Sequence, residues 1–263
     1  MRLTEKKTKN RSDYHIRSVQ RALQVLNAFS MTNPYLGVTE IAEITAIHKS
    51  TVHAILITLE DEGYVAKDIE KQKYFLTYKL FQLGSIVVQN VNALSISRPY
   101  MELLCKDTGQ SVSLNVLSQK KRLVVDVFEN EQPLKLTLYP GELLSLHSSA
   151  AGKVLMAGLS KDEFEDIVST EGLKPMTHKT ITDKKILEAE LELVRKNGYA
   201  LCIGESYWAG SVGVPLKNYA GQVVASLCIY GPIQDYESNK LDNYISSCLH
   251  YSDMISKLLG FNL

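Results

Sequence analysis

TEIAEITAIHKSTVHAILITLEDEG, residues 39–63, is the stretch that decides the fold of the N-terminal part of this chain. It predicts two short helices joined by a tight bend, because apolar residues recur at helical spacing on either side of the bend. In the second helix the apolar stripe starts at Val52 and returns at i+3, i+4 and i+7. We expect Thr39 and Ser50 to be the two N-caps, since a hydroxyl there accepts hydrogen bonds from orphan backbone amides. Gly63 is expected to end the second helix in left-handed backbone.

The charge along the second helix is uneven. Polar and basic residues occupy positions 48–53 at its start, and three acids occupy positions 60–62 at its end, where they oppose the helix dipole. A helix with donors at its N-terminus and acids at its far end suits a DNA major groove that it enters N-terminus first. An ordinary helical hairpin with a solvated charged face is the alternative interpretation of this segment alone.

The flanking segments complete a winged helix-turn-helix pattern. A helix is expected over residues 17–30, and short strands over 64–68 and 73–77 are separated by a charged turn typical of an exposed hairpin. Three helices followed by a two-stranded ribbon is the order of a winged helix-turn-helix. We therefore predict a DNA-binding domain over residues 17–78, with the recognition helix at 50–59 in the major groove.

The predicted contacts with double-stranded DNA lie on the first helix, at the starts of the two following helices, along the recognition helix and on the wing. The arginines of the first helix and the wing lysines are expected to bind phosphates, which position a protein without reading bases. These contacts are Arg17, Arg21, Thr39, His48, Lys49, Ser50, Thr51, His53, Ala54, Thr58, Lys71 and Lys73.

Composition describes a soluble globular protein long enough for two domains, with 45% hydrophobic and 22% charged residues in 263. Its apolar runs are shorter than a membrane span, and its first residues lack a signal-peptide core, so we expect a cytoplasmic protein without membrane contact. Its four cysteines have no CxxC or CxxH spacing and are expected to be buried thiols in a reducing compartment.

The net charge of zero hides an asymmetry. Residues 1–80 carry 12 Lys/Arg against 9 Asp/Glu, or +3, and residues 1–21 carry 7 against 2, or +5. We expect residues 1–16 to be a basic flexible arm that contacts a polyanion, and a solubilising tail is the alternative.

The rest of the chain predicts a linker helix and a second domain. An apolar-rich helix over 79–95 is expected to pack on a partner protomer or on its own domain. Over residues 96–263 helices and antiparallel hairpins alternate, which indicates an α+β sensor-type domain. Strands are expected over 112–118, 122–128, 134–139, 199–204, 211–216 and 222–230, and helices over 98–109, 148–157, 161–169, 183–198 and 236–259.

Several motifs together resemble the IclR family of bacterial transcription regulators across nearly the whole chain. They are SVQRALQVLNAF (18–29), TEIAEIT (39–45), KSTVHAILITLEDEGYV (49–65), KYFLTYKLFQLG (73–84), LSLHSSAAGKVLMAGL (144–159), TIT (180–182), ELELVRKNGYA (190–200) and QVVASLCIYGP (222–232). The resemblance implies a C-terminal effector-binding domain with a GAF/profilin-like antiparallel sheet. It also implies a homodimer, or a homotetramer built as a dimer of dimers, on palindromic operators, with RNA polymerase as a further partner.

The resemblance places the effector contacts by motif position, and small carboxylates and aromatic acids are common effectors in the family. The positions are Leu146, Ser148, Ser149, Ala150, Leu155, Glu205, Val212, Cys228 and Tyr230. Cys228 and Tyr230 stand where the family usually has small hydroxyl residues, which narrows the pocket and favours a flatter or larger apolar acid, or another ligand class. Ala54 stands where the family usually has an arginine, which favours thymine methyl groups over guanine.

Other functions stay open. A thiol-dependent enzyme would use Cys202 or Cys228 with His147 as base, and a dimeric interaction module would lack DNA binding altogether. SSAAGKV is not a phosphate-binding loop, because the first glycine and the final Ser/Thr of that motif are missing. We expect no cofactor and no metal site, since His147, His178 and the cysteines lack ligand spacing. The small residues 148–152 form either an anion site at a helix start or close helix–sheet packing.

Overall fold

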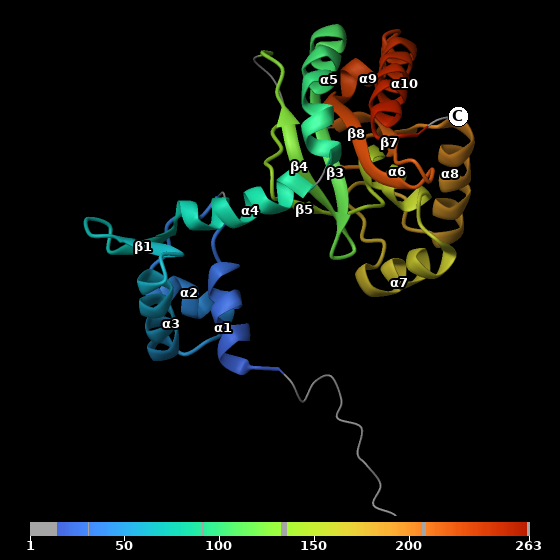
Figure 1. Cartoon of the computed structure of the whole chain (residues 1–263). Coiled ribbons are helices and arrows are strands. Elements are labelled where there is room, and N and C mark those ends of the chain that lie inside the picture. The colour runs from blue at the N-terminus through green and yellow to red at the C-terminus, as the bar shows by residue number, and fades with distance from the viewer. Residues whose placement is uncertain (1–14, 31, 91, 133–135, 207–208, 262–263) are drawn as a thin grey trace, which may run out of the picture. The chain divides into compact units, whose positions relative to one another are not determined.

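The computed structural model describes residues 15–30, 32–90, 92–132, 136–206 and 209–261 (Figure 1). The chain divides into two compact units, residues 1–87 and 88–263, each with its own hydrophobic core. Among the described residues, none of the helices combines the length and the hydrophobicity that crossing a bilayer requires.

The N-terminal unit is a winged helix-turn-helix, as predicted. Its elements are α1 (Arg17–Leu26), α2 (Val38–Thr45), α3 (Lys49–Asp61), β1 (Val65–Asp68) and β2 (Lys73–Leu76). The three helices enclose a core that includes Val25, Ile41, Val52 and Leu56, all fully buried. β1 and β2 pair antiparallel, and an isolated bridge at Leu36 extends the wing. α1 is four residues shorter than predicted.

Both N-cap predictions are wrong. α2 is capped by Gly37, whose N–H donates to Glu40 Oε2 at 2.7 Å, and Thr39 lies inside the helix. α3 is capped by His48, whose Nδ1 accepts from the Ser50 N–H at 3.4 Å and lies 2.8 Å from the Ser50 hydroxyl. At α2 the Glu40 carboxylate, and at α3 the His48 imidazole, accepts the backbone N–H bond that the hydroxyl of Thr39 or Ser50 was expected to accept. Gly63 has φ +75°, which confirms the predicted end of α3.

The predicted linker helix over 79–95 corresponds to two helices, α4 (Tyr78–Asn90) and α5 (Asn92–Thr108). The helix expected to start at residue 98 therefore begins earlier. Pro99 lies inside α5, where a proline lacks the N–H of one helical hydrogen bond.

Within the described residues, six strands form one antiparallel sheet in the order β5-β4-β3-β8-β7-β6. They are β3 (Ser111–Ser118), β4 (Lys121–Phe128), β5 (Leu143–Leu144), β6 (Ala200–Ile203), β7 (Ala209–Lys217) and β8 (Val223–Pro232). Gln119 and Lys120 join β3 to β4 with positive φ at both positions, the conformation of a two-residue hairpin turn. The strand predicted over 134–139 is absent at residues 136–139, and its first part lies outside the described residues.

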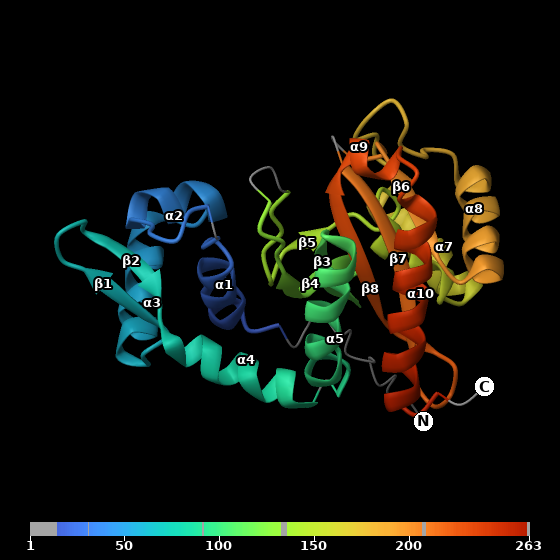
Figure 2. The ribbon, with the colours of Figure 1, turned by 90° about the horizontal axis from the view of Figure 1, so that it is seen from above.

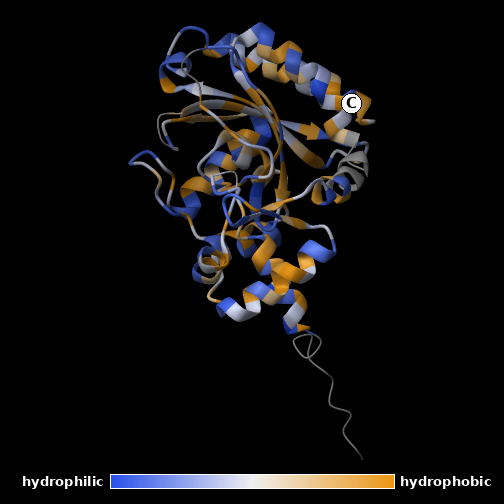
Figure 3. Cartoon of the chain, turned by 90° about the vertical axis from the view of Figure 1, so that its left-hand side faces the viewer, coloured by the Kyte–Doolittle hydropathy of each residue, from blue (hydrophilic) through white to orange (hydrophobic). Residues whose placement is uncertain are grey.

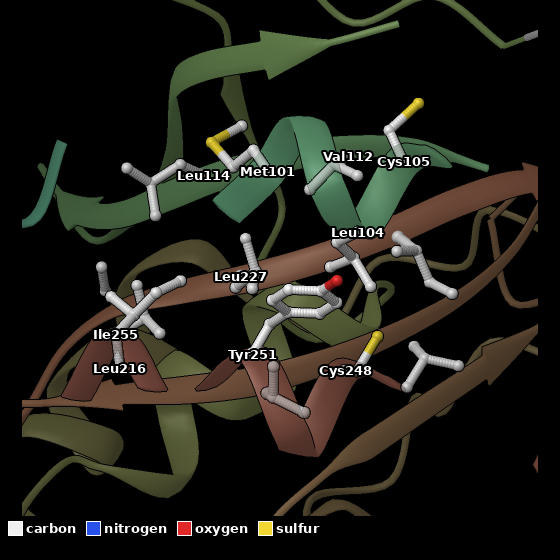
Figure 4. Close-up of a cluster of buried hydrophobic side chains, with 14 of the residues drawn as sticks. Met101, Leu104, Cys105, Val112, Leu114, Leu216, Leu227, Cys248, Tyr251 and Ile255 are labelled. Atoms are coloured by element: carbon white, nitrogen blue, oxygen red, sulfur yellow. The ribbon is translucent and has the colours of Figure 1, made fainter. Parts of the chain in front are cut away.

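Helices cover both faces of the sheet (Figures 1 and 2). On one face α5 and α10 (Leu241–Leu258) pack side by side over the largest core, which includes Met101, Leu104, Cys248 and Ile255 (Figure 4). On the other lie α6 (Ala150–Ala157), α7 (Lys161–Glu171) and α8 (Lys184–Asn197). Hydrophobic residues, orange in Figure 3, run along the sheet and the helices beside it. The final helix predicted over 236–259 corresponds to α10, which starts five residues later than predicted, and a short helix, α9 (Ile233–Tyr236), precedes it.

Candidate functional site

The predicted recognition helix, α3, presents a polar side to solvent. Val52, Leu56 and Leu59 point into the core, and this burial leaves the residues between them outside. The side chains predicted to contact DNA are accordingly exposed on α3, apart from the half-buried Thr51: His48, Lys49, Ser50, His53, Ala54 and Thr58. The Thr58 hydroxyl donates to the Ala54 carbonyl at 3.1 Å. The structure thus brings these candidates together on the exposed side of α3.

Arg17 and Arg21 are exposed on α1, and Thr39 is exposed in the first turn of α2. The two arginines are four residues apart and therefore lie on one face of the helix. They form a local basic surface on the same unit as α3.

The two wing lysines differ in their surroundings. Lys71, at the wing tip, lies 3.6 Å from Asp68 and 3.9 Å above the centre of the Tyr35 ring. Lys73 pairs with Glu40 of α2 at 2.8 Å, so part of its charge is already balanced within the unit. Sequence spacing did not reveal this pair, because its members are 33 residues apart.

A cavity of about 200 Å³ opens on the face of the sheet that also carries α6. Gly213 on β7 permits the close packing beside it, since a Cβ there would lie 2.7 Å from the Ala150 carbonyl carbon. Strands β3, β4, β7 and β8, the N-cap of α6 and the segment around residue 137 form its walls. The lining residues are Ser113, Arg122, Leu136, Thr137, Leu138, Ser149, Ser206, Ala209, Ser211, Cys228 and Tyr230.

Arg122 is the charged group of this cavity, and sequence reasoning missed it. The residue is only 7% exposed, its Nη1 donates to Asn115 Oδ1 at 2.9 Å, and its Nε has no hydrogen-bond partner among the described residues. Burial lowers the pKa of its guanidinium, but an arginine stays protonated at neutral pH. The alternation of residues 122–128 predicted a strand, but it did not predict that Arg122 faces a cavity. The signal was present, because Arg122 is in phase with the inward-facing Val124.

Cys228 and Tyr230, two of the predicted effector residues, line the cavity from β8, and Ser149 joins them from the start of α6. Ser211 on β7 pairs directly with Tyr230. Burial raises the pKa of the Cys228 thiol to about 12 and also raises that of the Tyr230 hydroxyl. The Tyr230 hydroxyl is buried and makes no well-formed hydrogen bond with the part of the chain that the structure describes, although the Ser111 hydroxyl and the Leu138 backbone are close enough to influence its pKa.

Three predicted effector residues lie elsewhere in the domain. Leu146 and Leu155 pack in a cluster with Phe164 of α7. Val212 belongs to the core beneath α5 and α10, because successive side chains of a strand point to opposite faces. Its neighbour Ser211 takes the position facing the cavity.

Ser148 and Ala150 flank the N-cap of α6 but do not line the cavity. Ser148 is buried, and its carbonyl lies 3.4 Å from the Cys202 sulfur. Ala150 packs in the small cluster that includes Cys202 and Cys228. Close helix–sheet packing therefore accounts for both residues.

Glu205 belongs to a buried ion-pair network centred on Lys153, whose exposure is 0%. The Lys153 ammonium lies 2.6 Å from Glu205 Oε1 and 3.1 Å from Glu190 Oε1, and donates to the Leu201 carbonyl at 3.3 Å. Burial raises the pKa of the Glu205 carboxyl, against the opposing effect of the Lys153 ammonium. Glu205 Oε2 has no partner among the described residues.

The thiol-enzyme alternative finds no support in this geometry. Burial raises the pKa of Cys202, as it does that of Cys228, so both thiols stay protonated near neutral pH. The His147 ring hydrogen-bonds the Lys174 carbonyl at 3.0 Å, and burial lowers its pKa. In the part of the chain that the structure describes, no group of three or more His, Cys, Asp or Glu could hold a metal ion.

Comparison with known proteins bears directly on both units. Residues 18–68 match the "IclR helix-turn-helix domain", and residues 85–257 match the domain described as "Bacterial transcriptional regulator IclR C-terminal". The regulator KdgR of Escherichia coli (strain K12) is 30% identical over 249 residues, which cover 94% of this chain and 94% of that protein. XynR of the same organism is 28% identical over 247 residues, covering 94% of this chain and 98% of that protein.

A solved structure agrees with these matches. The crystal structure of the Thermotoga maritima IclR is 29% identical, covers 94% of this chain and 100% of that one, and has a TM-score of 0.76. These relatives are named as transcriptional regulators, not as enzymes. This chain belongs to the IclR family of bacterial transcriptional regulators.

Proposed function

We propose that this protein binds palindromic operator DNA as a homodimer or as a dimer of dimers. We further propose that its affinity for the operator changes when a small molecule fills the cavity. The observation that carries the sensing half is the cavity itself. It is built from side chains of four strands and one helix start. Two of its polar groups, Arg122 Nε and the Tyr230 hydroxyl, are buried and make no well-formed hydrogen bond within the described residues. Buried polar groups are ordinarily hydrogen-bonded, so a ligand that pairs them is favoured.

The DNA-reading half rests on α3. Its exposed side carries hydroxyls, imidazoles and one lysine, Lys49, next to the helix N-terminus. These groups suit base edges and phosphates in a major groove. Arg17, Arg21 and Lys71 are proposed to bind phosphates beside it.

Self-association is supported by α1. Ile16, Val19 and Leu23 are 66%, 53% and 54% exposed, and at spacings of three and four residues they form one apolar strip. Such a strip on a soluble protein marks an interaction site, and a second copy of this chain is its proposed partner. Two copies would present two α3 helices to half-sites about one or more turns of DNA apart.

Regulation follows from linkage between the two sites. A ligand changes operator affinity only if it binds the DNA-bound and free forms with different affinities. The cavity touches β3 and β4, and α5 packs on the opposite side of these strands. Because α5 follows α4 in the chain, we propose that filling the cavity alters the helices that join the two units. We propose a cytoplasmic location and an effect on RNA polymerase through operator occupancy.

The test of this proposal is a mobility-shift titration of the purified full-length protein on its own upstream DNA. Binding should be specific against unrelated DNA and should weaken steeply with salt, because each phosphate contact releases about one counterion. A metabolite screen by thermal shift, followed by the same titration with each hit, should find a compound that changes operator affinity. A protein that ignores its own upstream DNA at low ionic strength, with and without such hits, contradicts the proposal.

A further inference from the structure

We infer that the middle of α3 reads thymine, with the side chains of Ala54 and Ile57 packed against the 5-methyl groups of thymines in the operator. This inference rests on the proposed function, since it names the base that the proposed recognition helix selects. It comes from hydrogen bonds that the polar side chains of α3 already make within the folded chain, and from a large apolar side chain that α3 leaves exposed.

Two hydroxyl groups on the exposed side of α3 are engaged within the helix itself. The Thr58 hydroxyl donates to the Ala54 carbonyl at 3.1 Å. The Ser50 hydroxyl lies 2.8 Å from His48 Nδ1, and because that nitrogen also accepts the Ser50 N–H, the hydroxyl is the donor. A hydroxyl carries a single proton, so neither group has one left for a base. Between Ala54 and Thr58, all of which the structure describes, the exposed side chains therefore offer no proton to guanine O6 or N7.

The same part of the helix presents an apolar surface to solvent. Ile57 is 44% exposed, although Leu56 beside it is fully buried. Ala54 is exposed three residues before Ile57, a spacing that makes the two side chains neighbours on the helix surface. Thr58 follows Ala54 by four residues and adds a methyl group to this surface. These three residues form a small apolar surface on the side of α3 that faces away from the core.

A thymine methyl group is the base-edge feature that matches such a surface. In the major groove the 5-methyl group distinguishes thymine from the other three bases, and apolar side chains contact it there. Removing one methyl group from water contributes about 4-fold in affinity. A cytosine or guanine at the same place would lose its hydrogen bonds to water and gain no partner from Ala54 or Ile57, which disfavours both bases.

DNA is the occupant that we assign to this surface, because the surface continues the exposed side of α3 that carries Lys49 and His53. Lys49 at the start of the helix suits a phosphate or a guanine, and Glu60 and Asp61 at its end suit the amino group of a cytosine. The apolar surface lies between these polar ends. The contacted thymines are therefore expected inside each half-site and not at its borders.

The test compares the full-length protein on DNA with and without thymine methyl groups. The upstream fragment is amplified once with dTTP and once with dUTP, which gives the same sequence with uracil in place of thymine. Equilibrium mobility shift at one fixed salt concentration measures the affinity for each fragment. We expect the uracil fragment to bind about 15-fold more weakly, because a symmetric operator loses one contacted methyl group in each half-site. A difference below about 4-fold, the contribution of a single methyl group, overturns the inference.

Variants then distinguish a contact with the methyl group from an effect of uracil on the shape of the DNA. Ile57→Ala should reduce the ratio of the two affinities at least 3-fold, whereas an effect of shape alone would leave that ratio unchanged. Ile57→Gln should reduce it equally, and it supplies a second measurement with a polar side chain at this exposed position. Ile186→Ala removes an isoleucine that is 60% exposed on α8 and should preserve the whole ratio. Circular dichroism confirms which variants are folded, and an unchanged ratio in either folded Ile57 variant overturns the inference.

Binding to unsubstituted DNA is measured first, so that failure of the proposed function is recognised separately. Specific binding that does not depend on the methyl groups leaves the proposed function standing and overturns the inference. A protein that binds neither its upstream DNA nor any sequence selected from a random library contradicts the proposed function, and the inference fails with it. Synthetic duplexes with one symmetric pair of thymines replaced at a time then locate the contacted bases, which should lie inside the half-sites.

Discussion

The ammonium of Lys73 in the wing lies 2.8 Å from the Glu40 carboxylate of α2. The other oxygen of that carboxylate accepts the N–H of Gly37, the N-cap of the helix. One side chain therefore caps α2 and holds the β-ribbon against it. This pair ties the wing to α2 within the N-terminal unit.

The first prediction concerns the pH dependence of this capping carboxylate. The Gly37 amide and then Lys73 lower the pKa of Glu40 from its ordinary value of 4.5. A lowered acid pKa contributes stability above the ordinary value, and that contribution is lost as the pH falls through the lowered value. As the pH is lowered from about 6 to about 3, the free energy of unfolding of Glu40→Gln, measured by chemical denaturation, should therefore fall less than that of the wild type. Glu43→Gln, an exposed change on the same helix, is the control, and identical pH profiles for Glu40→Gln and wild type would contradict the role.

The second prediction concerns the groove contact of α3. Lys49→Glu places an acid beside the N-terminus of the recognition helix, where DNA brings phosphates and base edges. We expect a loss of affinity of about 5- to 150-fold, the range for one lost contact of about 1–3 kcal/mol. Mobility shift on the upstream DNA measures it, and Lys196→Glu on α8 is the charge-matched control. If folded Lys49→Glu still binds the upstream DNA as tightly as the wild type, the proposal that α3 enters the major groove is wrong.

The third prediction separates the two wing lysines. Lys71 is at the wing tip, whereas Lys73 is already paired with Glu40. Lys71→Ala should weaken binding on all sequences and reduce the slope of log affinity against log salt by about 1. Lys73→Ala should change that slope less, because part of its charge is balanced within the protein. Salt titrations of both variants provide the measurement, and a larger change for Lys73→Ala would refute this ranking.

The fourth prediction concerns the buried network of the C-terminal unit. Lys153→Met leaves the Glu205 carboxylate buried without its cation, and breaking such a pair costs about 3–5 kcal/mol. The double variant Lys153→Met with Glu205→Gln removes the stranded charge and should recover part of that loss. Calorimetric melting of the three proteins compares these values. If the double variant melts no higher than Lys153→Met, the ion pair is not the source of the loss.

Local patterns were sufficient for the order and type of most elements. The apolar stripe through Val52, Leu56 and Leu59 predicted the buried side of α3, and Gly63 predicted its end. Element boundaries were less accurate where a distant or unexpected partner decided them. The caps at Gly37 and His48 depend on a carboxylate and an imidazole that the hydroxyl rule overlooks.

The family, the two units and the antiparallel sheet follow from the sequence by itself, because hydrophobic periodicity and motif order are properties of neighbouring residues. The content of the cavity was decided only by tertiary structure. Pairing of β3 with β4 and β8 brings Arg122 and Tyr230 to one cavity although they are distant in sequence. Pairing of β7 with β8 places Ser211 opposite Tyr230 and Val212 opposite Ile229, and Val212 therefore faces the core. The side chains of a strand alternate between its two faces, and the neighbouring strands and helices decide which face is buried in the core. A shift of one position therefore exchanges a core residue for one that lines the cavity.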